Sequence, residues 1–128
     1  MKKFWKIDQL NKVVCSDYSD SDECRAAVEI GNCFESREEA LRELERRRID
    51  AILRKHASKQ PLLGNERKYY HICCVHDRLP FSPSVLSVSS TKVIDFATPL
   101  FEIKQDAYDA IEEAGGAEHI IKYYFSGV

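Results

Sequence analysis

The sequence repeats itself once, and this repeat limits the folds that the chain can adopt. Three pairs of segments align: residues 4–7 (FWKI) with 69–72 (YYHI) and 27–30 (AVEI) with 92–95 (KVID) at an offset of 65 residues, and 34–44 with 101–111 at an offset of 67 residues. Such self-similarity is typical of a chain built from two copies of one supersecondary unit. We therefore expect two related halves.

Each half reads as strand, loop, strand and helix. In the first half, residues 4–7 are aromatic and apolar, as at the start of a strand, and residues 16–23 (SDYSDSDE) are polar, as in a loop. Val28 and Ile30 alternate with a charged residue, which favours a second, half-buried strand.

The first helix is predicted from Arg37 to about His56. Ser36 and Glu39 have the S-x-x-E spacing of a capping box, which marks a helix start. Apolar residues then recur at helical spacing and predict one buried stripe. The members of this stripe are Ala40, Leu41, Leu44, Ala51 and Ile52.

The second helix is predicted to begin near Lys104 and to end at Gly115-Gly116, because glycine readily takes the left-handed conformation that closes a helix. Its apolar residues are Ala107, Tyr108, Ile111 and Ala114. The tail 117–125 (AEHIIKYYF) has apolar residues at helical spacing and predicts a short closing helix.

These elements predict the α+β class. Two ββα units have too few strands to be stable alone, so we expect them to form one antiparallel sheet with helices packed on one face. The predicted organisation is a single domain over residues 1–128. It consists of repeat 1–57, connector 58–66 and repeat 67–128.

The stretch HICCVH, residues 71–76, places two histidines and two cysteines close together. Successive residues of a strand point to opposite faces, so His71 and Cys73 share one face and Cys74 and His76 share the other. A tetrahedral metal needs ligands that converge on one point. We therefore expect no metal site here, and the chain shows no catalytic motif and no sign of a cofactor.

Composition indicates a globular protein of the cytoplasm. The chain has a net charge of −2, with 44% hydrophobic and 31% charged residues. No apolar run is long enough to span a membrane, and the N-terminus lacks the apolar segment of a secretory signal. The five cysteines have no framework spacing, so we expect thiols rather than disulfides.

Charge is concentrated at the end of the first predicted helix. Residues 46–59 hold six Lys or Arg and one Asp. One interpretation is a solvated helix end; the other is a binding patch for an anionic partner. The patch would consist of Arg46, Arg47, Arg48, Arg54 and Lys55. Arg48 interrupts the apolar stripe, so it extends to solvent, pairs with a carboxylate, or marks where the helix leaves its own core for a partner.

The second predicted helix carries an opposite patch. Its acidic residues are Asp106, Asp109, Glu112 and Glu113, with Glu118 in the tail. An acidic helix face of this kind can imitate nucleic acid toward a basic protein. The chain thus offers two charged surfaces to partners of opposite charge.

Residues 31–40 (GNCFESREEA) form a motif GN-x-F-x-[ST]-x-E-E-A, which precedes a charged amphipathic helix and follows the aromatic FWKI. This pattern resembles small uncharacterised proteins of bacteriophages and prophages, and the closing IKYYF resembles the ends of some of them. The resemblance implies a phage or mobile-element origin and no established activity. Together with the missing secretory signal, it leads us to expect the protein in the cytoplasm of a host cell. It carries no catalytic residue over to this chain.

These observations lead to the hypothesis of a non-enzymatic, phage-encoded protein that binds and inhibits a host protein, such as a CRISPR effector or another defence nuclease. A second hypothesis is a nucleic-acid-binding accessory protein that uses the basic patch. A third is a sponge that holds a small nucleotide between the halves or between subunits. A homodimer is a further expectation for an exposed sheet edge, and we expect no membrane partner.

Overall fold

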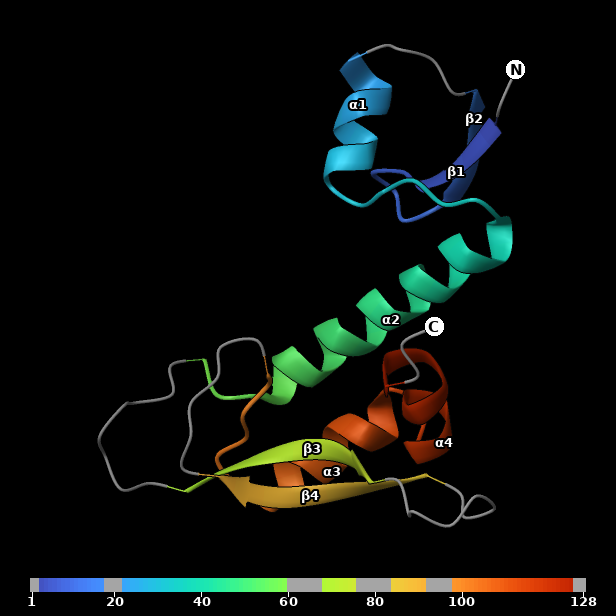
Figure 1. Cartoon of the computed structure of the whole chain (residues 1–128). Helices are drawn as coiled ribbons and strands as arrows, with labels where there is room; N and C mark the ends of the chain where they lie inside the picture. The colour runs from blue at the N-terminus through green and yellow to red at the C-terminus, as the bar shows by residue number, and fades with distance from the viewer. Residues whose placement is uncertain (1–2, 18–21, 60–67, 76–83, 92–97, 126–128) are drawn as a thin grey trace. The chain divides into compact units, whose positions relative to one another are not determined.

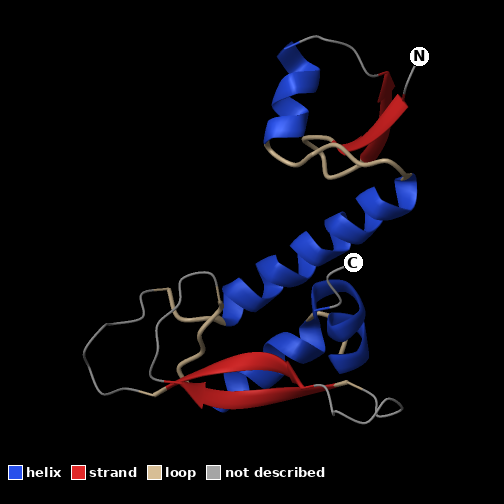
Figure 2. Cartoon of the chain, in the orientation of Figure 1, coloured by secondary structure: helices blue, strands red, loops and turns tan. Residues whose placement is uncertain are grey.

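The structure, a computed structural model, describes residues 3–17, 22–59, 68–75, 84–91 and 98–125 (Figure 1). The chain divides into two compact units, Met1–Arg47 and Arg48–Val128. Each unit combines a two-stranded antiparallel sheet with helices, so the chain is α+β, as predicted (Figure 2). The long helix α2 (Arg37–His56) crosses this boundary: its residues up to Arg47 belong to the first unit, and those from Arg48 belong to the second.

The first unit begins with a hairpin of β1 (Lys3–Ile7) and β2 (Val13–Asp17). Asp8 fixes its turn, because the carboxylate accepts hydrogen bonds from the backbone N–H of Leu10 (2.9 Å) and of Lys12 (2.9 Å). Short polar side chains that bind the backbone a few residues ahead favour turns over regular structure.

A helix follows where the sequence predicted a strand. α1 (Asp22–Glu29) buries Cys24 and Ala27, which are three residues apart and pack against Phe4 of β1. The alternation of Val28 and Ile30 predicted a half-buried strand, and this prediction is wrong. Both side chains are exposed, because the helical spacing of Cys24 and Ala27 determines which face is buried.

Residues 31–34, which precede α2, pair with the edge of β1 that faces away from β2. Trp5 and Phe34 exchange two backbone hydrogen bonds, of 2.9 and 2.8 Å. Two residues further along β1, the Asn32 side chain takes the place of a strand: its Oδ1 accepts from Ile7 N–H (2.8 Å), and its Nδ2 donates to Ile7 C=O (2.9 Å). Gly31, with φ of 72°, allows the chain to turn into this pairing.

The capping box at the start of α2 is confirmed in part. The Ser36 hydroxyl accepts a hydrogen bond from Glu39 N–H (3.2 Å), which satisfies one of the open donors of the first helical turn. The Glu39 carboxylate accepts from Glu35 N–H (3.3 Å) instead of from the N–H of Ser36. The helix extends from Arg37 to His56, as predicted.

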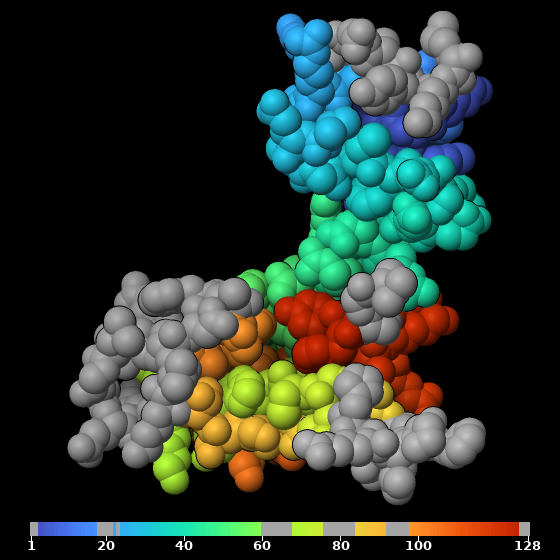
Figure 3. Space-filling view, in the orientation of Figure 1, coloured from blue at the N-terminus to red at the C-terminus, as the bar shows by residue number. Residues whose placement is uncertain are grey.

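After α2, the described residues of the second unit form a hairpin, two short helices and one turn of π-helix. The elements are β3 (Tyr69–Val75), β4 (Val85–Thr91), α3 (Lys104–Glu113), α4 (Ala117–Ile120) and the π-helix η1 (Ile121–Phe125). α3 and α4 pack against the hairpin, and in the space-filling view the red C-terminal segment lies against the yellow-green β3 (Figure 3).

β3 forms backbone hydrogen bonds along both of its edges. On one side it pairs with β4, and on the other Tyr70 and Phe101 exchange two backbone hydrogen bonds, both of 2.8 Å. α3 begins three residues after Phe101. It ends before Gly115 and Gly116, whose φ angles of 117° and 98° confirm the predicted glycine stop.

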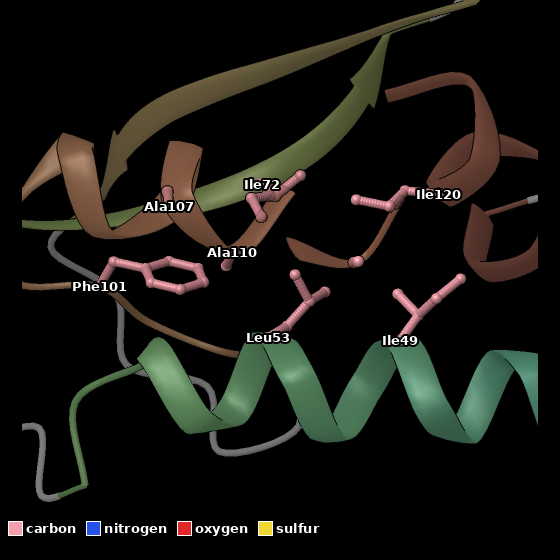
Figure 4. Packing of buried hydrophobic residues seen from close by; sticks show 8 residues of the cluster. Ile49, Leu53, Ile72, Phe101, Ala107, Ala110 and Ile120 are labelled. Atoms are coloured by element: carbon pink, nitrogen blue, oxygen red, sulfur yellow. The ribbon is translucent and has the colours of Figure 1, made fainter. Parts of the chain in front are cut away.

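The core of the second unit is closed by the second half of α2. Ile49 and Leu53 point from this helix toward Ile72 of β3, Ala110 of α3 and Ile120 of α4 (Figure 4). Ile49 and Leu53 are 0% and 1% exposed. The apolar stripe predicted for α2 is correct at Ala40, which is buried. It is wrong at Leu41 and Ala51, which are exposed. Leu44 and Ile52 are half-buried.

Other predictions have mixed outcomes. The described strands form two separate two-stranded sheets, so one continuous sheet is not confirmed. β2 and β4 were not predicted, because their serines and short apolar side chains give a weak strand pattern. Residues 92–95, and 60–66 of the predicted connector 58–66, lie outside the described residues. The single-domain assignment stays a prediction.

The Asn32 side chain is expected to be required for the first unit. In Asn32→Ala, both backbone groups of Ile7 lose their partner, at a cost of about 1–3 kcal/mol. Asn32→Asp should also destabilise, because a carboxylate cannot donate to Ile7 C=O. Urea unfolding followed by the fluorescence of Trp5, the single tryptophan, measures this. Gln9→Ala, at an exposed position, is the control and should have no effect.

Leu53→Ala is expected to lower the free energy of unfolding by about 2–5 kcal/mol, because it leaves a cavity in the core of the second unit. Leu41→Ala makes the same chemical change on the same helix, at a residue that is 40% exposed, and should cost only about 0.5 kcal/mol. Circular dichroism in urea provides both values. Equal losses for the two variants would contradict the assignment of Leu53 to the core.

Candidate protein-binding surface

The position of α3 in the second unit determines which of its residues face outward. The Tyr70–Phe101 backbone pair anchors the segment directly before the helix, and Ala107, Ala110 and Ala114 fill the buried face. These alanines are three and four residues apart, so they form one row along the helix. Small side chains in this row let the helix backbone approach the core closely.

Tyr108 lies outside this row. The sequence predicted it in the apolar stripe with Ala107, but successive residues of a helix are about 100° apart around its axis. The ring is 50% exposed, and Ile103, directly before the helix, is 56% exposed. The alanine row could have revealed this, because it already supplies the complete buried face without Tyr108.

Two carboxylates lie near Tyr108 on the exposed part of α3. Asp109 is the next residue and Glu112 follows one turn later, and both are exposed. Asp109 accepts a hydrogen bond from the uncharged amide of Gln105 (2.9 Å). Among the described residues, neither Asp109 nor Glu112 forms an ion pair. We refer to Tyr108, Asp109 and Glu112 as the outer face of α3.

The other predicted acidic residues are placed differently. Asp106 is half-buried in the first turn of α3, where a negative charge complements the helix dipole. Glu118 is exposed in α4. Glu113 contacts α2: its carboxylate is 2.6 Å from Lys55 Nζ and 3.5 Å from His56 Nε2. Glu113 is therefore used within the fold.

The predicted basic patch is largely compensated within the chain. Glu43 accepts hydrogen bonds from Arg46 (2.8 and 2.9 Å) and from Arg47 (3.1 Å). Asp50 accepts from Arg54 (2.9 Å) in the second half of the same helix. Pairs three and four residues apart stabilise a helix by a few tenths of a kcal/mol each, about 0.2–0.5 kcal/mol.

Arg48 has a structural partner as well. Its guanidinium donates to the backbone C=O of Ala114 (2.8 Å), the residue that caps the C-terminal end of α3. A cation at this end satisfies an open carbonyl and complements the negative end of the helix dipole. With Ile49 and Leu53 buried next to it, Arg48 marks where α2 enters the core of the second unit.

Two carboxylates have lowered pKa values as a result of these contacts. The hydrogen bond from Arg46, supported by Arg47, lowers the pKa of Glu43 below its ordinary value. The hydrogen bond from Lys55 lowers the pKa of Glu113, with a smaller contribution from His56. Both carboxylates are therefore held in their charged form by α2.

Residues 71–75 of the HICCVH stretch lie in β3. Cys73 lies opposite Ser87, and its thiol is 3.5 Å from the backbone oxygen of that residue. The described part of the chain contains no group of three or more His, Cys, Asp or Glu that could hold a metal ion. His76 lies outside the described residues. None of the cysteines, all of which are described, forms a disulfide.

No described helix is both long and apolar enough to cross a membrane. Comparisons with known protein families, with characterised proteins and with solved structures found no match for this chain. The candidate surface therefore rests on its geometry and chemistry alone.

The contact between Lys55 and Glu113 predicts a pH-dependent contribution to stability. The pKa of Glu113 is lower in the folded chain than its ordinary value of 4.5, so the charged carboxylate stabilises the fold above that pH. This contribution is lost as the pH falls through the lower folded pKa. Glu113→Gln should therefore melt below the wild type at pH 7, and the difference should disappear in acid.

Thermal unfolding at a series of pH values measures this difference. Glu112→Gln removes a neighbouring exposed carboxylate that has no cation beside it in the described structure, and serves as the control. It should melt at or slightly above the wild-type temperature, because a negative charge at the C-terminal end of a helix is unfavourable. A difference for Glu113→Gln that persists unchanged at low pH would contradict the assignment.

Proposed function

We propose that this protein is a non-enzymatic binding protein that presents the outer face of α3 to a basic surface of a partner protein. The single observation that carries this proposal is the exposed ring of Tyr108 beside two carboxylates without an ion pair among the described residues. Partly exposed aromatic side chains are enriched among the residues that contribute most to protein interfaces.

The charge of this surface defines the partner. Residues 102–118 contain six carboxylates and one lysine, and only Glu113 forms an ion pair among the described residues. The Lys104 ammonium lies 5.8 Å from the centre of the Tyr70 ring and so is drawn toward β3. A surface rich in Arg and Lys would complement the remaining negative charge and bind faster at low ionic strength.

We further propose that the partner is a host protein that binds nucleic acid, and that binding inhibits it. The resemblance of the GN-x-F-x-[ST]-x-E-E-A motif to phage proteins supports a host target. A defence nuclease such as a CRISPR effector has the basic, nucleic-acid-binding channel that an acidic helix could occupy. In this role Asp109 and Glu112 would take the place of phosphates.

We also propose that the two units are copies of one ββα module. In each, the central strand exchanges two backbone hydrogen bonds with a phenylalanine: Trp5 with Phe34, and Tyr70 with Phe101. In each, a helix begins three residues after that phenylalanine. The pairs are related by the same offsets, 65 and 67 residues, as the sequence repeat.

The alternative functions have weaker support. A nucleic-acid-binding role would need the basic patch to contact phosphates, but each of its five residues already binds a carboxylate or a carbonyl. A nucleotide sponge would also need cations around a phosphate, and the five residues of the basic patch already have partners within the chain. The homodimer stays a prediction, based on an exposed sheet edge or the face of α2 that carries Arg48.

Affinity capture with matched variants tests the proposal. Wild type, Tyr108→Ala and the double variant Asp109→Lys with Glu112→Lys serve as baits in host lysate. The control, Glu29→Lys with Glu38→Lys, makes the same change in net charge at exposed residues of the first unit. A specific partner should be captured by the wild type and the control, at least tenfold less by the double variant, and less at high salt.

Purified partner then tests inhibition. If the partner is a nuclease, the wild type and the control should inhibit its cleavage of DNA, and the α3 double variant should not. Equal capture by the wild type and the α3 double variant would exclude the outer face of α3 as the binding surface. Gel shifts of nucleic acid at low salt that depend on Arg47 and Arg54 would favour the second hypothesis.

A further inference from the structure

A cavity of about 410 Å³ lies within the second unit, next to the buried cluster closed by α2. Leu53 of α2, Ile72 of β3, and Phe101, Tyr124 and Phe125 form its apolar walls. We propose that this cavity binds an uncharged aromatic molecule of two rings. This inference is independent of the proposed function, because the outer face of α3 contributes no residue to the cavity.

The size of the cavity determines the size of the ligand. An apolar protein cavity of about 150 Å³ can hold benzene, so this cavity has room for a molecule with two rings. Its volume also lies within the range of about 300–1,000 Å³ that is usual for small-molecule sites. Tyr124, Phe125, Thr98 and Cys74 are only partly buried, so a ligand can reach the walls from solvent.

The chemistry of the walls determines the class of ligand. The rings of Phe101, Tyr124 and Phe125 line the cavity, and aromatic ligands pack favourably against such rings in offset or edge-on geometry. The lining residues within the described ranges include no Lys, Arg, Asp or Glu. A phosphate or carboxylate would lose its hydration there without gaining a counter-charge, which is strongly unfavourable. The cavity therefore selects an uncharged molecule, not a nucleotide.

The walls are held in place before a ligand arrives. The Tyr124 hydroxyl donates to Asp50 of α2 (2.7 Å), and Asp50 is held in turn by Arg54 (2.9 Å). Phe101 is fixed by its two backbone hydrogen bonds to Tyr70. A preformed pocket loses less conformational entropy on binding, so its apolar contacts contribute more to affinity.

The backbone at the cavity supplies an independent argument. Tyr124 and Phe125 belong to η1, a π-helix. This conformation is rare and occurs often at functional sites, where it places side chains that a regular α-helix would direct elsewhere. Here it belongs to the segment that supplies Tyr124 and Phe125 to the cavity walls.

Titration with N-phenyl-1-naphthylamine, an uncharged probe whose fluorescence rises in apolar surroundings, tests the proposal. The wild type should show one saturable site. Cys74 shares a strand face with Ile72 and lines the cavity, so Cys74→Phe should fill it and weaken binding at least tenfold. Val75→Phe adds the same ring at the next residue, which is 45% exposed and does not line the cavity, and should leave binding unchanged.

A second measurement uses the wild-type chain and does not depend on the folding of a variant. Saturating probe should slow the alkylation of Cys74 by iodoacetamide, followed by peptide mass spectrometry. Alkylation of the exposed Cys15 in the first unit should not change. Non-saturable fluorescence, equal binding by Cys74→Phe and wild type, or no protection of Cys74 would each overturn the proposal.

Discussion

The second half of α2 makes the interaction on which the second unit depends. Ile49 and Leu53 close its apolar core, while the polar residues between and beside them contact the C-terminal segment. Arg48 caps α3 at Ala114, and Asp50 binds the Tyr124 hydroxyl. One helical segment therefore supplies apolar burial, a helix cap and a side-chain hydrogen bond to the same unit, so loss of its packing would affect all three.

This arrangement assigns different roles to the two charged patches. Lys55 and Arg48 compensate the C-terminal end of α3, where Glu113 and the open carbonyls would otherwise be unfavourable. Arg48 and Lys55 therefore contribute to the stability of the fold. The outer face of α3 has no such explanation, since Asp109 and Glu112 form no ion pair among the described residues and Tyr108 remains half exposed.

Local signals in the sequence predicted α2 and α3 well. The Ser36 cap, the length of α2 and the glycine stop after α3 depend on residues close in the chain, and each is found as expected. The strand predicted at Val28 failed because burial of Cys24 and Ala27 against Phe4, a tertiary contact, determines that segment. The roles of Arg48 and Asn32 also depend on distant partners, which local spacing cannot reveal.

The most direct test of the account is hydrogen exchange of the chain alone and in complex with a partner captured through α3. The account predicts slower exchange on binding in residues 102–113, because the outer face of α3 becomes covered. The backbone amides of residues 49–56 should already be protected in the unbound chain, since this part of α2 belongs to a core. Protection on binding that is confined to residues 46–56, with α3 unchanged, would contradict the account.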